Sequence, residues 1–348
     1  MRQTFALIFS LLCLSVSFVS VSQDTQTLTI VTYDSFAMSE EVLSQFEDEY
    51  NAELEVLRLS DAGVMVNQSI LSRNNPLGDV MYGVDNTFLS RALDEDLFFA
   101  YESPLLENIP EEFQLDDQYR ATPVTFGDVC LNYDVLYFVE NELPLPESLE
   151  DLIDPIYEGL LVVQNPATSS PGLAFLLTTI AVFDDEGDYT FVDYWADLVD
   201  NDVLITDGWT EAYYTYFSVH GGDRPLVLSY ASSPPVEMLF ADPRPEDAFT
   251  GAIVSDGMCF RQIEFVGILD GTENVELAQS FVDFVIDLPF QEALPLNMFV
   301  FPVHQEAELP ELFIEYTAIP ENAIAVDFNE LDENREDWIR AWTQVIRQ

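Results

Sequence analysis

A hydroxyl-rich loop between an apolar strand and an apolar helix is the first stretch whose residues could do chemistry. It covers residues 164–172, QNPATSSPG, and precedes the run LAFLLTTIAVF. Ser170 is typical of a helix N-cap and Pro171 of a first helical residue. Backbone amides and two hydroxyls at a positive helix end can receive an anionic or hydroxyl-bearing group. A simple cap is the competing interpretation, and both stay open.

Two further loops follow strands and carry aromatic or hydroxyl side chains. Residues 207–214, DGWTEAYY, enter a helix with Thr210 as the expected cap. Trp209 can stack on a flat ligand, and a cationic ring would gain about 0.5 to 2 kcal/mol from a cation–π interaction; core packing is the alternative. Residues 228–234, LSYASSP, end a strand with Tyr230 and two hydroxyls. Three loops at carboxyl ends of strands describe one side of a cleft.

The adjacent Tyr213 and Tyr214 raise the question of ferric iron, because paired phenolates are good iron ligands. Neighbouring residues of a helix diverge by about 100°, so half-buried packing competes with that interpretation. A cleft of carboxylates and aromatic rings would also suit a polyamine. A ferric-ion carrier and a polyamine-binding protein therefore remain alternatives.

The basic residues exclude several catalytic mechanisms. All 11 are Arg, and without Lys there is neither a Walker A loop nor a Schiff base. His220 and His304 lie far apart in the sequence, which disfavours a His-based triad or a zinc site. Two carboxylates can hydrolyse a glycoside, so a secreted acidic hydrolase is the remote alternative. We expect a protein that is not an enzyme and has no metal and no cofactor.

Acidic residues dominate the charge, with 64 Asp and Glu and a formal net charge of −53. This charge repels nucleic acid and anionic lipid. Dense carboxylates are typical of a salt-adapted, halophilic-type surface, and they repel one another unless salt screens them. We expect a monomer without a nucleic-acid partner, of low stability in dilute buffer.

The N-terminus has the features of a secretory leader. Arg2 precedes an apolar run over residues 5–21, and small residues surround Val21 in Ser20-Val21-Ser22. This pattern suits signal peptidase, which predicts a signal peptide over 1–22 and an exported, periplasmic or otherwise extracytoplasmic protein. Lipoprotein processing at Cys13 is disfavoured because two Leu precede it.

Strands and helices alternate along the chain, and the three loops described above each follow a predicted strand. A β-branched strand at residues 28–33, an acidic helix at 39–50 and a strand at 54–59 predict a β-α-β opening with a parallel sheet. Similar alternation continues to residue 229, so the class is α/β. Two extended segments, 129–133 and 260–269, are placed to cross between lobes. Cys130 lies in the first and Cys259 directly before the second, and the two could form a disulfide in an exported protein.

The crossings divide the mature chain into two lobes with a ligand cleft between them. We predict a first lobe from residues 27–128, an inserted second lobe from 129–261, and a return to the first lobe over 262–348 with the C-terminal helices. Trp338 and Trp342, four residues apart in the last helix, are expected in the core.

Together the loops resemble those of the thiamine-binding periplasmic proteins. The resemblance rests on residues 31–36, 83–86, 165–173, 208–213 and 226–234, and it is colinear over most of the mature chain. It implies a two-lobed, type II periplasmic-binding fold with two crossing hinge strands. It also implies a solute-binding protein of an ABC importer, with a permease and an ATPase as partners and thiamine, its monophosphate or its diphosphate as ligand.

The resemblance also implies a ligand site, position by position. The residues carried over are Asp61, Ala62, Gly63, Ser169, Ser170, Trp209, Tyr230, Ala231, Ser232, Ser233 and Phe299. Thiamine is a flat cation with an aminopyrimidine, which suits an aromatic face, acceptors and an amide-lined pocket. We expect Trp209 to stack on a ring and the hydroxyls with Tyr230 to surround the alcohol or phosphate end. Val236 and Phe299 replace a larger tyrosine and tryptophan of the family.

Overall fold

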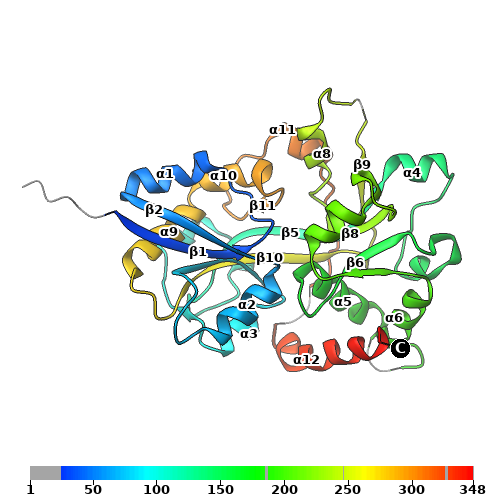
Figure 1. Ribbon diagram of the computed structural model, residues 1–348, viewed down its shortest axis with the longest axis horizontal. Coiled ribbons are helices and arrows are strands. Elements are labelled where there is room, and N and C mark those ends of the chain that lie inside the picture. The colour runs from blue at the N-terminus through cyan, green and yellow to red at the C-terminus, as the bar shows by residue number, and fades with distance from the viewer. Residues whose placement is uncertain (1–24, 185–186, 246, 326–327, 348) are drawn as a thin grey trace, which may run out of the picture.

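Two α/β lobes joined by two long antiparallel strands make up the molecule (Figure 1). The computed structural model describes residues 25–347 except 185–186, 246 and 326–327. The predicted signal peptide, 1–22, lies outside the described residues. None of the helices within the described part of the chain is long and apolar enough to span a membrane.

The first lobe is built on three parallel strands: β1 (Gln26–Tyr33) lies between β2 (Ala52–Leu59) and β3 (Val80–Asp85). The predicted β-α-β opening is confirmed, because α1 (Glu40–Tyr50) connects β1 to β2. The other helices of this lobe are α2 (Ala62–Leu71), α3 (Leu89–Asp94), α9 (Val275–Ile286) and α10 (Leu288–Asn297). Parallel strands joined by helices end at one edge of a sheet, which here faces the second lobe.

The second lobe is also parallel at its centre. Its strand β6 (Leu161–Gln164) lies between β7 (Leu204–Thr206) and β8 (Leu226–Tyr230). The helices are α4 (Val135–Glu140), α5 (Ser170–Phe183), α6 (Phe191–Asp200), α7 (Trp209–Glu211) and α8 (Pro235–Phe240). Eleven of the residues of α5 are buried and most of them are apolar, so this helix forms the core of the lobe.

The two lobes share one sheet through β5 (Thr122–Asp134) and β10 (Phe260–Leu269), which pair antiparallel with Phe260 opposite Val129. The strand order is β2-β1-β3-β10-β5-β8-β6-β7. The crossing strands predicted at 129–133 and 260–269 are confirmed, and β5 begins earlier because it also pairs with β11 (Phe301–Pro302) beside the first lobe. Three further elements are β4 (Phe98–Phe99), β9 (Thr250–Ile253) and α11 (Glu311–Tyr316).

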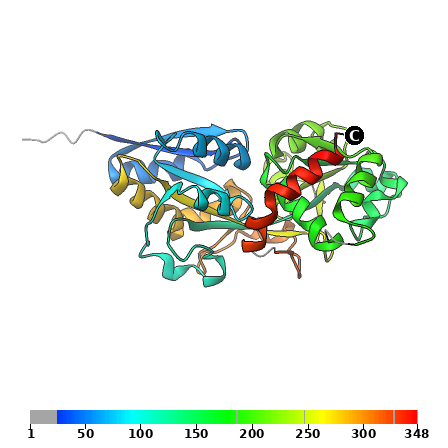
Figure 2. The same cartoon turned by 90° about the horizontal axis from the view of Figure 1, so that it is seen from below.

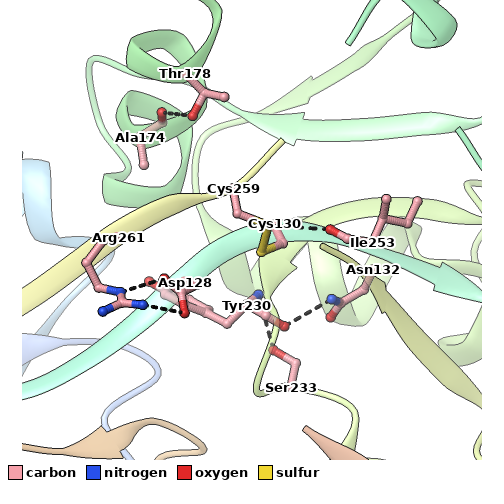
Figure 3. The surroundings of a disulfide bond; sticks show 10 residues. All are labelled: Asp128, Cys130, Asn132, Ala174, Thr178, Tyr230, Ser233, Ile253, Cys259 and Arg261. Atoms are coloured by element: carbon pink, nitrogen blue, oxygen red, sulfur yellow. Dashed lines mark hydrogen bonds and ion pairs between the residues drawn. A yellow bond between two sulfur atoms is a disulfide. The ribbon is translucent and has the colours of Figure 1, made fainter. Parts of the chain in front are cut away.

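A disulfide joins the crossing segments where they enter the second lobe (Figure 3). Cys130 lies on β5 and Cys259 directly before β10, with their Cα atoms 4.5 Å apart. The disulfide that the sequence left open is therefore present. Beside it, Arg261 Nε lies 2.6 Å from the Oδ1 of the buried Asp128, so a charged pair joins the same two strands.

The last helix, α12 (Phe328–Val345), lies across both lobes (Figure 2). Trp338 is 5% exposed and Trp342 1% exposed, which confirms their place in the core. Trp342 meets Trp195 of α6 edge to face at 5.7 Å between ring centroids, and Arg91 Nη1 of α3 lies 2.5 Å from Glu336 Oε1. The sequence assigned this helix to the first lobe, and the bounds of the lobes remain a prediction.

Candidate functional site

A cavity of about 450 Å³ lies where loops of the two lobes meet. Its first-lobe wall includes the loop after β1 and the start of α2, and its second-lobe wall includes the starts of α5, α7 and α8. Seven of the residues predicted for the site line it: Asp61, Ala62, Ser170, Trp209, Tyr230, Ser233 and Phe299. Gly63, Ser169, Ala231 and Ser232 are buried next to these residues and are not part of the lining.

Asp61 connects the two lobes at one end of the cavity. Its Oδ1 accepts hydrogen bonds from the amides of Ala62 (2.7 Å) and Ser170 (3.4 Å), and its Oδ2 accepts one from the amide of Trp209 (3.1 Å). A single first-lobe carboxylate thus meets the starts of α2, α5 and α7, where backbone N–H groups lack helical partners. Burial raises the pKa of Asp61 to about 7, although these amide bonds favour the charged form.

Two glycines allow this close approach. An added Cβ at Gly208 would lie 3.1 Å from Asp61 Oδ2, and one at Gly63 would lie 2.7 Å from the carbonyl oxygen of Thr168 in the second lobe. A side chain at either position would force the lobes apart at the Asp61 contact. Gly63 therefore acts through packing between the lobes.

The serine loop before α5 differs in detail from its prediction. The N-cap is Ser169 and not Ser170, so the helix begins one residue earlier than expected, and Pro171 occupies its second position. Ser169 lies close enough to Asp61 to lower its pKa, but its hydroxyl makes no hydrogen bond of normal geometry. The hydroxyl of Ser170 donates instead to the first-lobe carboxylate of Asp85.

Asp85 is a second buried carboxylate at the meeting of the lobes. Besides the Ser170 hydroxyl it accepts hydrogen bonds from the amide (2.7 Å) and hydroxyl (2.5 Å) of Thr87. Burial raises its pKa, while these donors lower it. The loop that was expected to hold an anionic ligand is thus bonded to two carboxylates of the protein itself.

Trp209 presents an aromatic face to the cavity from the start of α7. Its ring stacks on Tyr213 with centroids 4.8 Å apart and an angle of 19° between the planes, and its indole N–H donates to the Ser229 hydroxyl at 2.9 Å. Tyr213 is fully buried, so the stack fixes the orientation of the indole. Thr210, predicted to cap this helix, donates instead to Asp34 Oδ1 at 3.0 Å, and Gly208 is the N-cap.

The two adjacent tyrosines serve different purposes. The Tyr213 hydroxyl donates to Glu237 Oε1 at 2.9 Å, and this carboxylate also lies 3.2 Å from His220 Nε2. Burial and the neighbouring Glu237 raise the pKa of Tyr213 well above its usual value, which disfavours a phenolate. Tyr214 is 48% exposed and lines the cavity. The pair therefore does not offer two phenolates to an iron ion.

The LSYASSP segment forms the part of the cavity nearest the crossing strands. Tyr230 is half-buried and its hydroxyl donates to Gln262 Oε1 of β10 at 3.3 Å. Ser233 and Ser229 are joined by their hydroxyls at 2.9 Å. The buried Ser232 donates to the carbonyl oxygen of Phe299 at 2.6 Å, which attaches this segment to the first lobe.

Apolar residues also line the cavity. Phe299 is adjacent to Met298 and Val300 in the lining, and its ring lies edge to face with Phe240 of α8, with centroids 6.5 Å apart. Val236 also lines the cavity. Both positions where the sequence departs from the larger family aromatics thus face the ligand space.

Sequence reasoning missed several lining residues, two pairs of them with polar side chains. Tyr33 and Asp34 follow β1, within a stretch that was used only for the resemblance, and Gln262 and Glu264 lie on β10. Gln262 and Glu264 could have been found from the sequence, because two polar residues two positions apart in an apolar strand point to the same face of the sheet.

The chain is similar to known solute-binding proteins. Residues 75–229 match the family of bacterial extracellular solute-binding proteins. A thiamine-binding periplasmic protein of Escherichia coli K12 is 30% identical over 326 residues, covering 92% of this chain and 93% of that protein. A solved structure of a periplasmic thiamin-binding protein superimposes with a TM-score of 0.81 at 27% identity, covering 93% of this chain and 98% of that one.

The two-lobed, type II periplasmic-binding fold expected from the sequence is confirmed by these likenesses. The iron-bound HitA of Pseudomonas aeruginosa shares the fold with a TM-score of 0.72 at 18% identity, covering 92% of this chain and 99% of that one. The relatives are solute-binding proteins, which points away from an enzyme.

Proposed function

Since the chain belongs to the family of thiamine-binding periplasmic proteins, we propose that it binds thiamine, and thiamine phosphates less tightly, in the cavity between its lobes. It works outside the cytoplasm and delivers the ligand to a membrane permease that a separate ATPase drives. The ligand is carried and released without chemical change.

The observation that carries this proposal is the fixed indole of Trp209. One face rests on Tyr213 and the ring edge is held by Ser229, so the lining side is oriented before a ligand arrives. A flat cationic ring stacked there gains both apolar contact and a cation–π interaction. An oriented aromatic binds at a lower entropic cost than a mobile one.

The charge of the lining also favours a cation. Asp34, Asp61 and Glu264 line the cavity, and no described lining residue is basic. Hydroxyl and amide groups of Ser233, Asn297 and Gln262 offer further partners to an aminopyrimidine. An anionic solute would meet only repulsion from the charged groups of this lining.

The position of Asp61 sets the expected order of the ligands. The amides of Ser170 and Trp209, which could hold a phosphate, are bonded to its carboxylate. A phosphate ester would have to displace this carboxylate or lie beside it against electrostatic repulsion. Thiamine should therefore bind more tightly than its mono- or diphosphate.

Calorimetric titration of the ligand-free protein tests the proposal, with thiamine, thiamine monophosphate, a linear polyamine and ferric citrate as the four ligands. We expect thiamine to bind at the lowest concentration, in a complex of one ligand per chain. Tight polyamine binding with no heat from thiamine would assign the carboxylate-lined cavity to a different cation. A visible charge-transfer band on adding ferric iron would assign the cavity to a metal ion.

A further inference from the structure

Glu264 is a buried carboxylate in the wall of the cavity, on the strand that links the lobes. It lies on β10 between Ile263 and Phe265, and 7% of its surface is exposed. It lines the cavity together with Gln262, two residues earlier on the same face of the strand. Neither the resemblance nor the loops of the sequence pointed to it.

Among the described residues, the polar groups that face Glu264 include no positively charged side chain. Its Oε2 accepts a hydrogen bond from the Thr125 hydroxyl at 2.7 Å, and the Tyr33 hydroxyl lies close enough to lower its pKa. The titratable groups that face it from the strands and loops around it are Tyr33, Tyr82, Tyr230, Asp61 and Asp85. The phenols have their pKa values raised by burial and by Glu264 itself, so they stay neutral.

A carboxylate in this position is destabilised when it is charged. Burial, and then the charges of Asp85 and Asp61, raise the pKa of Glu264 to about 7, although the Thr125 hydrogen bond and the nearby Tyr33 hydroxyl lower it. Burying a charge without a counter-ion is unfavourable, and a cation at close range reverses the effect. The negative charge of Glu264 is thus one that a positively charged ligand would balance.

The other lining carboxylates are less suited to this role. Both oxygens of Asp61 accept backbone amides, and Asp34 is exposed at the edge of the cavity and bonded to Thr210. Glu264 faces the cavity from the strand that carries the hinge, close to the second-lobe aromatic Tyr230.

Building on the proposed function, we propose that Glu264 is the specificity-determining counter-ion of the cavity: it selects a ligand with a cationic ring over a neutral ring of similar shape. The ligand's positive charge replaces the missing basic side chain, while Trp209 and the apolar residues bind either kind of ring. Selection by charge is then separate from binding by stacking.

The exchange Glu264→Gln tests this, because it keeps the size and one acceptor oxygen and removes the charge. Thiamine and the uncharged fused-ring compound thiochrome are titrated against the wild type and the variant at pH 8 in 0.3 M salt, where surface charges are screened. We expect thiamine to lose at least about 30-fold in affinity and thiochrome less than about 3-fold. Glu273→Gln, an exposed residue outside the cavity, is the matched control and should leave both affinities unchanged.

The results separate the inference from the function on which it rests. Equal losses for the two ligands, or none, would overturn the role of Glu264 while leaving thiamine as the ligand. No thiamine binding by the wild type would overturn both. A melting curve of the Gln variant at or above that of the wild type shows that folding is intact.

Proton release gives a second measurement that a structural role would not affect. At pH 6 Glu264 holds a proton that a bound cation displaces, so titrations in buffers of different ionisation enthalpy should show protons released by the wild type and fewer by Glu264→Gln. The same release by both proteins would contradict the inference.

Discussion

The two lobes bring opposite chemistry to their meeting point. The first lobe supplies acceptors, the carboxylates of Asp34, Asp61 and Asp85. The second lobe supplies donors, chiefly the amides and hydroxyls at the starts of α5 and α7. The difference shows that the lobes recognise each other through helix N-termini and carboxylates, while the ligand is left an aromatic face and the hinge carboxylate Glu264.

A change of pH should have the largest effect, because it changes the charge of the buried carboxylates. Asp61 and Glu264 have pKa values of about 7 in the folded protein against 3.8 and 4.5 ordinarily. Between these limits the folded chain binds more protons than the unfolded one, so the free energy of unfolding falls as the pH rises from 5 to 8. We expect a decrease on the order of several kcal/mol.

Thermal melts of the ligand-free protein at constant salt across this pH range check the sign. A melting temperature that rises from pH 5 to 8 would mean that the buried carboxylates are stabilised as ions. Asp61→Asn together with Glu264→Gln should flatten the profile.

Removing the carboxylate that joins the lobes is the next largest change. Asp61→Ala leaves the amides of Ala62, Ser170 and Trp209 without their acceptor, and we expect thiamine affinity to fall about 100-fold because the lobes then separate. X-ray scattering should show a larger radius of gyration.

Asp61→Asn should be compared with Asp61→Ala, because the side-chain oxygen of Asn can still accept hydrogen bonds. It should stay compact and gain affinity for thiamine monophosphate relative to thiamine by about 10-fold, because one negative charge beside the phosphate is gone. Asp207→Ala, an exposed neighbour of Gly208, serves as a control and should change neither the shape nor the affinities.

Replacing Trp209 tests the aromatic face that the two lobes leave free for the ligand. Trp209→Ala should weaken thiamine and thiamine monophosphate about equally, by roughly 1 to 3 kcal/mol for a lost buried aromatic contact. Trp209→Phe keeps a ring but loses the bond to Ser229, and it should cost less. Calorimetry of both ligands decides, and unequal losses would place the phosphate against the indole.

The smallest effect is expected at the serine loop. Exchanging both Ser169 and Ser170 for Ala removes the hydroxyl that bonds to Asp85. We expect this to cost roughly 1 kcal/mol of binding free energy. The loss should be the same for thiamine and its monophosphate, because the structure directs this hydroxyl to a carboxylate. A selective loss for the monophosphate would restore the loop as a phosphate site.

Much of the fold follows from local patterns in the sequence. β-branched runs and apolar helix faces predicted β1, α1 and the crossing strands, and the position of Cys130 and Cys259 at those crossings made a disulfide possible without deciding it. Helix starts were less certain, because Ser169 and Ser170 are equally good caps by type. The long-range acceptor Asp85 engages Ser170, and sequence spacing does not reveal such a partner.

The chemistry between the lobes depends on contacts that local patterns do not contain. Asp61 meets Trp209 across 148 positions, and Thr125 meets Glu264 across 139. Single acidic residues in a chain with 64 of them carry little signal on their own. Burial distinguishes these carboxylates from the surface acids, and burial becomes visible only once the lobes are assembled.

A crystal structure of the protein with thiamine bound would test the central claim most directly. The account predicts one thiamine in the cavity, with a ring stacked on the face of Trp209 that points away from Tyr213. Its cationic ring should lie within about 6 Å of the Glu264 carboxylate, the range over which opposite charges shift each other's ionisation. Thiamine found outside the cavity, or with its cationic ring remote from Glu264, would contradict it.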